Sequence, residues 1–188
     1  MRGTSSNDLI LNNVGVQESD LVELPEFVSG GKINGWLLHI PATYLGVAQA
    51  ARDYAVQFAN THSPNSLNGP IAQLPNVQQL IGEIDLELKK ARFVIYGAAS
   101  CYDNKDTKHI LTNEVSVAKH IVTNSAITIV DKAMRLVGAK SLQRTNPLQR
   151  YYRDVRAGLH NPPMDDMTIK KLALTALEKD KNKNNKDK

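Results

Sequence analysis

The segment that follows Pro75 carries the feature that most constrains the fold. Apolar residues recur there at spacings of three and four, which places them along one side of an α-helix. Proline suits the first turn of a helix, because the N–H that it lacks would have no partner there. The pattern predicts a long helix from Pro75 to about Cys101 that buries one face against other helices. The residues of this face are Val77, Ile81, Ile84, Leu88, Ala91, Ile95 and Ala98.

Similar patterns follow along most of the chain. Helices are predicted over 34–60, over 112–138 with Gly138 as the stop, over 147–159, and from the aspartates after the double proline to about Leu177. Long helices with short connections and inward-facing apolar stripes are typical of helical bundles. The sequence therefore predicts a mainly α fold, an antiparallel four-helix up-and-down bundle.

The two ends of the chain differ from this bundle, which we assign to residues 31–178. Residues 1–30 contain two short apolar runs, at 9–11 and 14–16, separated by two asparagines, and they are typical of the remnant of a β structure. Residues 179–188 hold five Lys, two Asp and no apolar residue. A segment of this composition cannot bury a core, so a disordered charged tail is predicted.

Charge and cysteine content exclude several classes of protein. The net charge is +4, and because the tail supplies +3, the other 178 residues carry only +1, which gives no sign of a nucleic-acid groove. No apolar run approaches the roughly 20 residues needed to cross a membrane.

The chain has a single cysteine, Cys101, so an internal disulfide is excluded and a cytoplasmic location is favoured. We interpret Cys101 as a small buried residue. The spacing of four histidines predicts no metal site; they are His39, His62, His109 and His120.

Four stretches resemble acyl-CoA dehydrogenases, in the order in which that family has them. "NPLQRYYRDVRAG" (146–158) is similar to a Pro-x-x-Arg-x-x-Arg-Asp segment, and "DKAMRLVGAKSL" (131–142) to the helix end that precedes it. "TYLGVAQAARDYAVQFA" (43–59) resembles the first helix of the C-terminal domain, and "MRGTSSNDLILNNVGV" (1–16) the last strands of the middle β domain. The resemblance implies a truncated chain that holds the end of the β domain and the C-terminal bundle.

The resemblance also implies a reaction and an assembly. Family members bind FAD between subunits, remove a proton beside the thioester of an acyl-CoA, and pass a hydride from the next carbon to the flavin, a chemistry of fatty acid metabolism. The domain implies a homo-oligomer, a dimer or tetramer, formed through the bundle. The proton step needs a carboxylate, and register assigns its two usual positions to Pro162 and Trp36. Neither residue can be a base, so this chain alone is expected to be inactive.

The remaining catalytic candidates lie in the turn after the Arg-Asp segment. His160 is the titrating group there with an intrinsic pKa near neutrality, and it is either catalytic or an ordinary loop histidine. Asp165 and Asp166 are interpreted as caps of the last helix.

The positions that contact the flavin in the family hold Arg135, Gly138 and Ala139, where Gln-x-x-Gly-Gly is usual. Arg135 would either bind a phosphate group or remain a solvated charge at a helix end. Arg153 and Asp154 match the family best, and we interpret them as structural, a salt-bridged pair that fixes the turn between two helices.

Two alternatives to a dehydrogenase stay open. The absence of both glutamates suits the flavin-dependent monooxygenase branch of the same superfamily, which uses reduced flavin and oxygen. The bundle would otherwise serve as a non-catalytic oligomerisation module, whose exposed apolar stripes are covered by partner helices.

Overall fold

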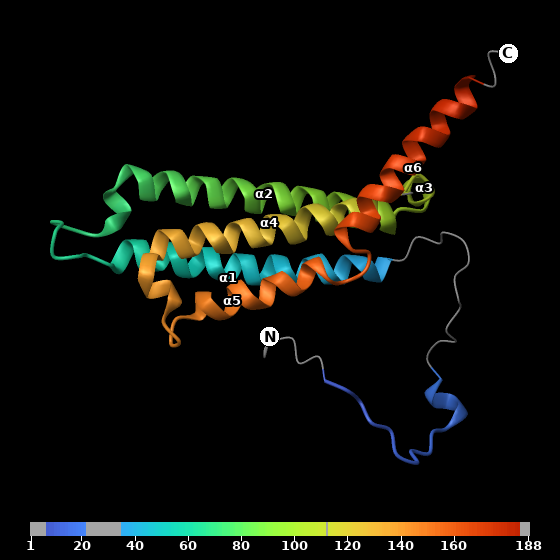
Figure 1. Cartoon of the computed structure of the whole chain (residues 1–188), viewed down its shortest axis with the longest axis horizontal. Coiled ribbons are helices and arrows are strands. Elements are labelled where there is room, and N and C mark those ends of the chain that lie inside the picture. The colour runs from blue at the N-terminus through green and yellow to red at the C-terminus, as the bar shows by residue number, and fades with distance from the viewer. Residues whose placement is uncertain (1–6, 22–34, 112, 185–188) are drawn as a thin grey trace.

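The computed structural model describes residues 7–21, 35–111 and 113–184, with side chains as far as Glu178. Of the three long helices, α1 (His39–Thr61) and α4 (Glu114–Val137) run in the same direction, and α2 (Pro75–Asp103) runs antiparallel to both. The shorter α5 (Pro147–Val155) lies along α1 and α4 as the fourth helix (Figure 1). The mainly α class and the antiparallel arrangement are therefore confirmed.

Two further helices and several short 3-10 turns complete the described chain. α3 (Lys105–Lys108) lies between α2 and α4, and α6 (Asp165–Asn184) leaves the bundle at an angle (Figure 1). No helix in the described ranges combines the length and the apolar character that crossing a membrane requires. The 3-10 turns are Glu18–Asp20, Gly35–Leu38, Ile71–Gln73, Gly138–Leu142 and Arg156–Leu159.

The residues predicted to begin and end helices do so in the structure. Pro75 and Pro147 each occupy the first turn of a helix. The Asn146 side chain caps α5 by accepting a hydrogen bond of 3.0 Å from the Leu148 N–H, and its amide donates to the Tyr54 hydroxyl. Gly138 ends α4 with a φ of +70°, a conformation that glycine adopts without steric cost.

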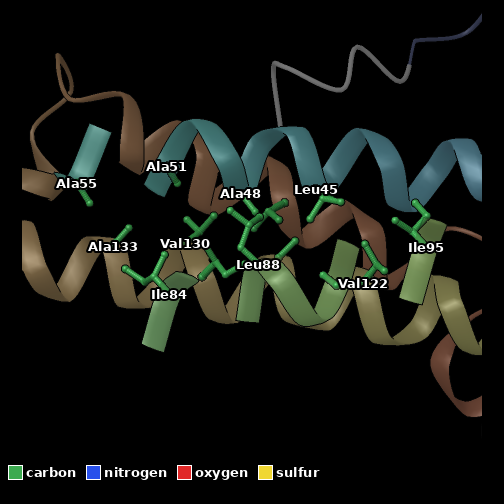
Figure 2. Packing of buried hydrophobic residues seen from close by; sticks show 14 of the residues in the cluster. Leu45, Ala48, Ala51, Ala55, Ile84, Leu88, Ile95, Val122, Val130 and Ala133 are labelled. Atoms are coloured by element: carbon green, nitrogen blue, oxygen red, sulfur yellow. The ribbon is translucent and has the colours of Figure 1, made fainter. Parts of the chain in front are cut away.

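The core lies between α1, α2 and α4 and is apolar. The α2 stripe predicted from the sequence points inward, and Ile84, Leu88 and Ile95 meet side chains of α1 and α4 (Figure 2). α1 contributes small residues to this layer, so that α4 can approach its backbone closely. These fully buried residues of α1 are Ala48, Ala51, Ala55 and Ala59.

One prediction for the N-terminal part is not met. The described residues contain no strand, and residues 9–11 and 14–16 are exposed and carry no regular element. Two short strands are only marginally stable without a larger sheet or a helix to pack on, which is the physical reason for the difference. Residues 1–6 and 22–30 of the predicted remnant lie outside the described residues, and Trp36, which follows the remnant, lies in the 3-10 turn before α1.

The C-terminal part also differs from the prediction. α6 continues to Asn184, so the first six residues of the predicted disordered tail are helical. This stretch contains neither Pro nor Gly, and its lysines are good helix formers. Asp165 and Asp166 lie in the first turn of α6 rather than at a cap position, and the Asp165 carboxylate contacts α4 instead.

Candidate functional site

A cavity of about 540 Å³ opens where α4 ends and α5 begins. Its wall comes from the last turns of α4, the 3-10 turn after Gly138, and one face of α5. It gathers all three residues that the sequence assigned to the cofactor, and it adds Arg153. The lining residues are Asp131, Met134, Arg135, Gly138, Ala139, Ser141, Leu142, Gln149, Tyr152 and Arg153.

The cavity carries two guanidinium groups and one carboxylate. Arg135 is largely exposed, and its Nε donates to Asp131 Oδ2 one helical turn earlier, at 2.7 Å. This hydrogen bond and the charge of Asp131 raise the pKa of Arg135, so the group stays charged. Arg153 lies on the α5 side of the same cavity and is also exposed. The wall therefore offers one positive charge beyond the pair that Arg135 forms with Asp131.

Arg153 and Asp154 do not form the salt bridge that the sequence suggested. Among the described residues neither side chain has an ion pair. Arg153 lines the cavity, whereas Asp154 lies on the side of Tyr44. Burial, and to a lesser degree the charge of Asp154, raise the pKa of Tyr44.

The turn with the catalytic candidates lies beyond the other end of α5 (Figure 1). His160 follows the 3-10 turn Arg156–Leu159 and is exposed, and it is not part of the cavity wall. Its neighbour Asn161 accepts a hydrogen bond of 2.8 Å from the Tyr44 hydroxyl, which ties the turn to α1. Pro162 is exposed as well. The structure thus brings the cofactor candidates together and keeps them apart from the catalytic candidate.

A second polar cluster, which we call the α6 anchor, joins α4 to the start of α6. Asp165 Oδ2 accepts a hydrogen bond of 2.8 Å from the Asn124 amide, and His120 Nδ1 lies 3.0 Å from Asp165 Oδ1. Lys119 is fully buried, with its Nζ 3.7 Å from the same Oδ1. Lys119 Nζ and the buried Thr168 hydroxyl have no hydrogen-bond partner among the described residues.

The protonation of the α6 anchor follows from burial and charge. Burial lowers the pKa of Lys119, and the nearby Asp165 carboxylate only partly offsets this. Burial also acts to raise the pKa of Asp165. The Asn124 amide, the His120 ring and the Lys119 charge together outweigh it, so that the pKa of Asp165 is lowered. The anchor is therefore a carboxylate held among donors rather than an isolated helix cap.

Sequence reasoning missed Lys119, Asn124 and the Tyr44–Asn161 contact. The periodicity of α4 predicts an inward stripe through Ala118 and Val122, but α4 is surrounded by other helices and buries a wider face. A lysine inside a run of apolar and hydroxyl residues was the available signal. The contact between Tyr44 and Asn161 joins residues 117 positions apart, for which the sequence offers no local signal.

Comparisons with known proteins agree with this architecture. The family model described as "Acyl-CoA dehydrogenase, C-terminal domain" matches residues 37–159. The Bacillus subtilis (strain 168) protein "Putative acyl-CoA dehydrogenase YdbM" is 65% identical over 178 residues, which cover 95% of this chain and 47% of that protein. The 3-(aryl)acrylate reductase of Clostridium sporogenes (strain ATCC 15579) is 33% identical over 162 residues, 83% of this chain and 41% of that protein.

A solved structure gives the same result for the fold. The crystal structure of an acyl-CoA dehydrogenase from Slackia heliotrinireducens DSM 20476 matches with a TM-score of 0.68 and 26% identity, over 78% of this chain and 37% of that chain. This chain thus spans less than half the length of each of these three relatives. The matched segment covers α1, α2, α4 and α5. The chain belongs to the acyl-CoA dehydrogenase family, and residues 37–159 are its C-terminal domain.

Proposed function

We propose that the chain is the C-terminal bundle of an FAD-dependent oxidoreductase of the acyl-CoA dehydrogenase type, and that it supplies one wall of the flavin site. The observation that carries this proposal is the cavity at the end of α4. It joins Arg135, Gly138 and Ala139, which the family resemblance selected independently of any structure, to a second arginine, Arg153.

The residues of the cavity fit a flavin dinucleotide. Guanidinium groups bind phosphate oxygens through paired hydrogen bonds, and the diphosphate carries the negative charge that the excess arginine would balance. Met134 and Leu142 provide apolar contact area for a ring. We assign the phosphate contacts to Arg135 and Arg153. When bound, FAD would supply the hydride acceptor for an acyl-CoA substrate.

Spectroscopy of the purified chain tests the flavin site. FAD is added and absorbance is recorded from 350 to 500 nm, with the bound fraction measured by equilibrium dialysis. Arg135→Gln and Arg153→Gln should each weaken binding by about 10- to 100-fold, the loss expected for a charged hydrogen bond. Arg150→Gln is the matched control, because Arg150 is an exposed arginine of the same helix that does not line the cavity.

Two results would contradict this assignment. Absence of flavin binding by the unmodified chain at high FAD concentration would remove the proposed site. Equal weakening by all three arginine variants would show that general positive charge, rather than the cavity, attracts the dinucleotide.

A second candidate is the monooxygenase branch of the superfamily. Two points favour it: the family register assigns Pro162 and Trp36 to the positions of the usual glutamate, and His160 is exposed in a turn held by Asn161 and Tyr44. The test compares flavin-loaded protein in two assays. Reduction of bound FAD by an acyl-CoA would support a dehydrogenase. Oxygen consumption by the reduced form that falls in His160→Gln would support a monooxygenase.

We further infer that the bundle assembles into a homo-oligomer, a dimer or a tetramer. The support is the amount of apolar surface that the described helices leave exposed on α2 and α6, which is more than scattered single residues. Light scattering across a range of protein concentrations tests this part of the proposal separately from flavin binding.

A further inference from the structure

The contact between α6 and α4 buries almost no apolar surface of α6. α6 leaves the bundle at an angle (Figure 1), and of its described side chains only Thr168 is fully buried, while Asp165 and Thr175 are half-buried. These three polar residues are separated by three and seven positions, which places them on one side of the helix. The apolar side chains of α6 already face solvent, so its separation from α4 would expose little more of them.

Several buried polar groups at this contact have no hydrogen bond. Lys119 Nζ and the Thr168 hydroxyl have no partner among the described residues, and neither has Asn113 Oδ1, although the Asn113 amide nitrogen donates to Thr175. A polar group buried in this way destabilises the closed contact, because the same group bonds to water once it is exposed. In the described apolar layer between α1, α2 and α4, no buried side-chain atom lacks a partner.

The turn that leads into α6 is fixed to the bundle at its first residue and only lightly after it. A Cβ atom added at the buried Gly158 would lie 3.1 Å from the Tyr44 ring and from the Thr123 side chain, so the backbone there packs directly on α1 and α4. In the next five described residues, 160–164, the side chains make one hydrogen bond, which Asn161 accepts from the Tyr44 hydroxyl at 2.8 Å.

We propose that residues 160–178 form a strap that detaches from the bundle and returns to it as one unit, while α1, α2, α4 and α5 stay folded. Its hinge follows Gly158. Two attachments hold the strap closed: the hydrogen bond between Tyr44 and Asn161, and the polar contact of α6 with α4 that includes the α6 anchor.

The balance of contacts explains why the strap opens before the bundle does. A segment with little buried apolar surface and a few directional contacts opens at a lower free energy than a packed core. Opening breaks those hydrogen bonds, but it also gives water to the groups that lack a partner in the closed form. The strap carries His160, so each opening moves the catalytic candidate of the proposed function away from α1.

Amide hydrogen exchange of the full chain, followed by NMR, measures the opening directly. Amides of α6 between Thr168 and Thr175 should exchange through an opening whose equilibrium constant is at least about 100-fold larger than that of amides in the middle of α4. Exchange of both segments with the same opening constant would overturn the strap. The measurement needs no flavin, so its failure is separate from failure of the flavin site.

Two identical substitutions on α6 test the role of the unpartnered groups. Thr168→Val removes a buried hydroxyl that has no partner and keeps the shape, so α6 should exchange about 5-fold more slowly or better. Thr175→Val removes the acceptor of the Asn113 amide, so α6 should exchange about 2- to 10-fold faster. The two changes are matched in volume and helix propensity. A shift of the same sign in both variants would show that hydrogen bonding does not control the contact.

A third substitution tests whether the turn and α6 move together. Tyr44→Phe removes the hydrogen bond to Asn161, and it should speed exchange of the α6 amides by the same factor as that of the His160 amide, which donates to the Ala157 carbonyl. Tyr151→Phe is the matched control, because Tyr151 is also half-buried and its hydroxyl makes no hydrogen bond among the described residues. Faster exchange at His160 with no change in α6 would contradict the movement of the strap as one unit.

Discussion

The contacts that α4 makes with the core helices and with α6 use opposite kinds of side chain. Against α1 and α2, α4 places Val122, Ile129 and Ala133 in an apolar layer. Against α6 it places Asn124 and His120, which meet the Asp165 carboxylate. The apolar layer gains from every buried methyl group and has little directionality, whereas the α6 anchor depends on a few directional contacts.

α6 contacts the bundle through polar side chains, unlike the core helices. Thr168 is buried at its contact with α4, and Thr175 accepts a hydrogen bond of 3.2 Å from the Asn113 amide. Its apolar side chains instead face solvent: Met167, Ile169, Leu172, Leu174 and Leu177. Polar contacts therefore hold α6 on the bundle, which makes its attachment more sensitive to single substitutions and to pH than the core is.

The largest expected effect comes from the core. Leu88→Ala removes a side chain that is only 4% exposed between α1 and α4, and it should lower the free energy of unfolding by about 2–5 kcal/mol because a cavity remains. Urea denaturation followed by circular dichroism measures this. A loss below about 1 kcal/mol would mean that the core is less tightly packed than the structure shows.

The next effect comes from the α6 anchor. Asp165→Ala leaves the Lys119 ammonium buried without its carboxylate, and we expect a loss of about 1–3 kcal/mol. Amide hydrogen exchange should show the loss concentrated in α6. Lys119→Met removes the buried charge at similar volume and should be close to neutral.

A double-mutant cycle sharpens this test. If Lys119 and Asp165 interact, Asp165→Ala should cost less in the Lys119→Met background than in the unmodified chain. Equal costs in both backgrounds would assign the role of Asp165 to Asn124 and His120 alone.

The anchor should also weaken in acid. The folded pKa of Asp165 lies below its ordinary value of 3.8, so its contribution is complete above about pH 4 and is lost as the pH falls through the folded pKa. The difference in unfolding free energy between pH 7 and pH 3 should be smaller in Asp165→Asn than in the unmodified chain. Other carboxylates with lowered pKa values, such as Asp85 and Glu83, affect both proteins equally and cancel.

The smallest effect is expected on the outer side of α6. Leu177→Gln replaces a side chain that is 62% exposed, and the free energy of unfolding should change by less than about 0.5 kcal/mol. Thermal unfolding of the two proteins side by side checks this. A larger loss would show that Leu177 is covered by another surface in solution.

The sequence by itself determined the helical fold and its local boundaries. Pro75, Pro147 and Gly138 act within a single turn of backbone, and the stripe on α2 follows from helix periodicity, so no distant residue is needed to predict them. The four segments that resemble the family can likewise be read directly along the chain, without knowledge of distant contacts. The strands near the N-terminus failed as a prediction because a strand depends on partners that its own residues do not specify.

Only the tertiary structure decided which side chains meet. Arg135 and Arg153 come from different helices, and their shared cavity depends on how α5 folds back along α4. Lys119 is buried beside Asp165 of α6, although its own stretch of sequence does not require this. Periodicity tells which face of a helix is apolar. The packing of the other helices decides which polar groups are buried away from water and which apolar side chains, such as Phe93, stay exposed to solvent.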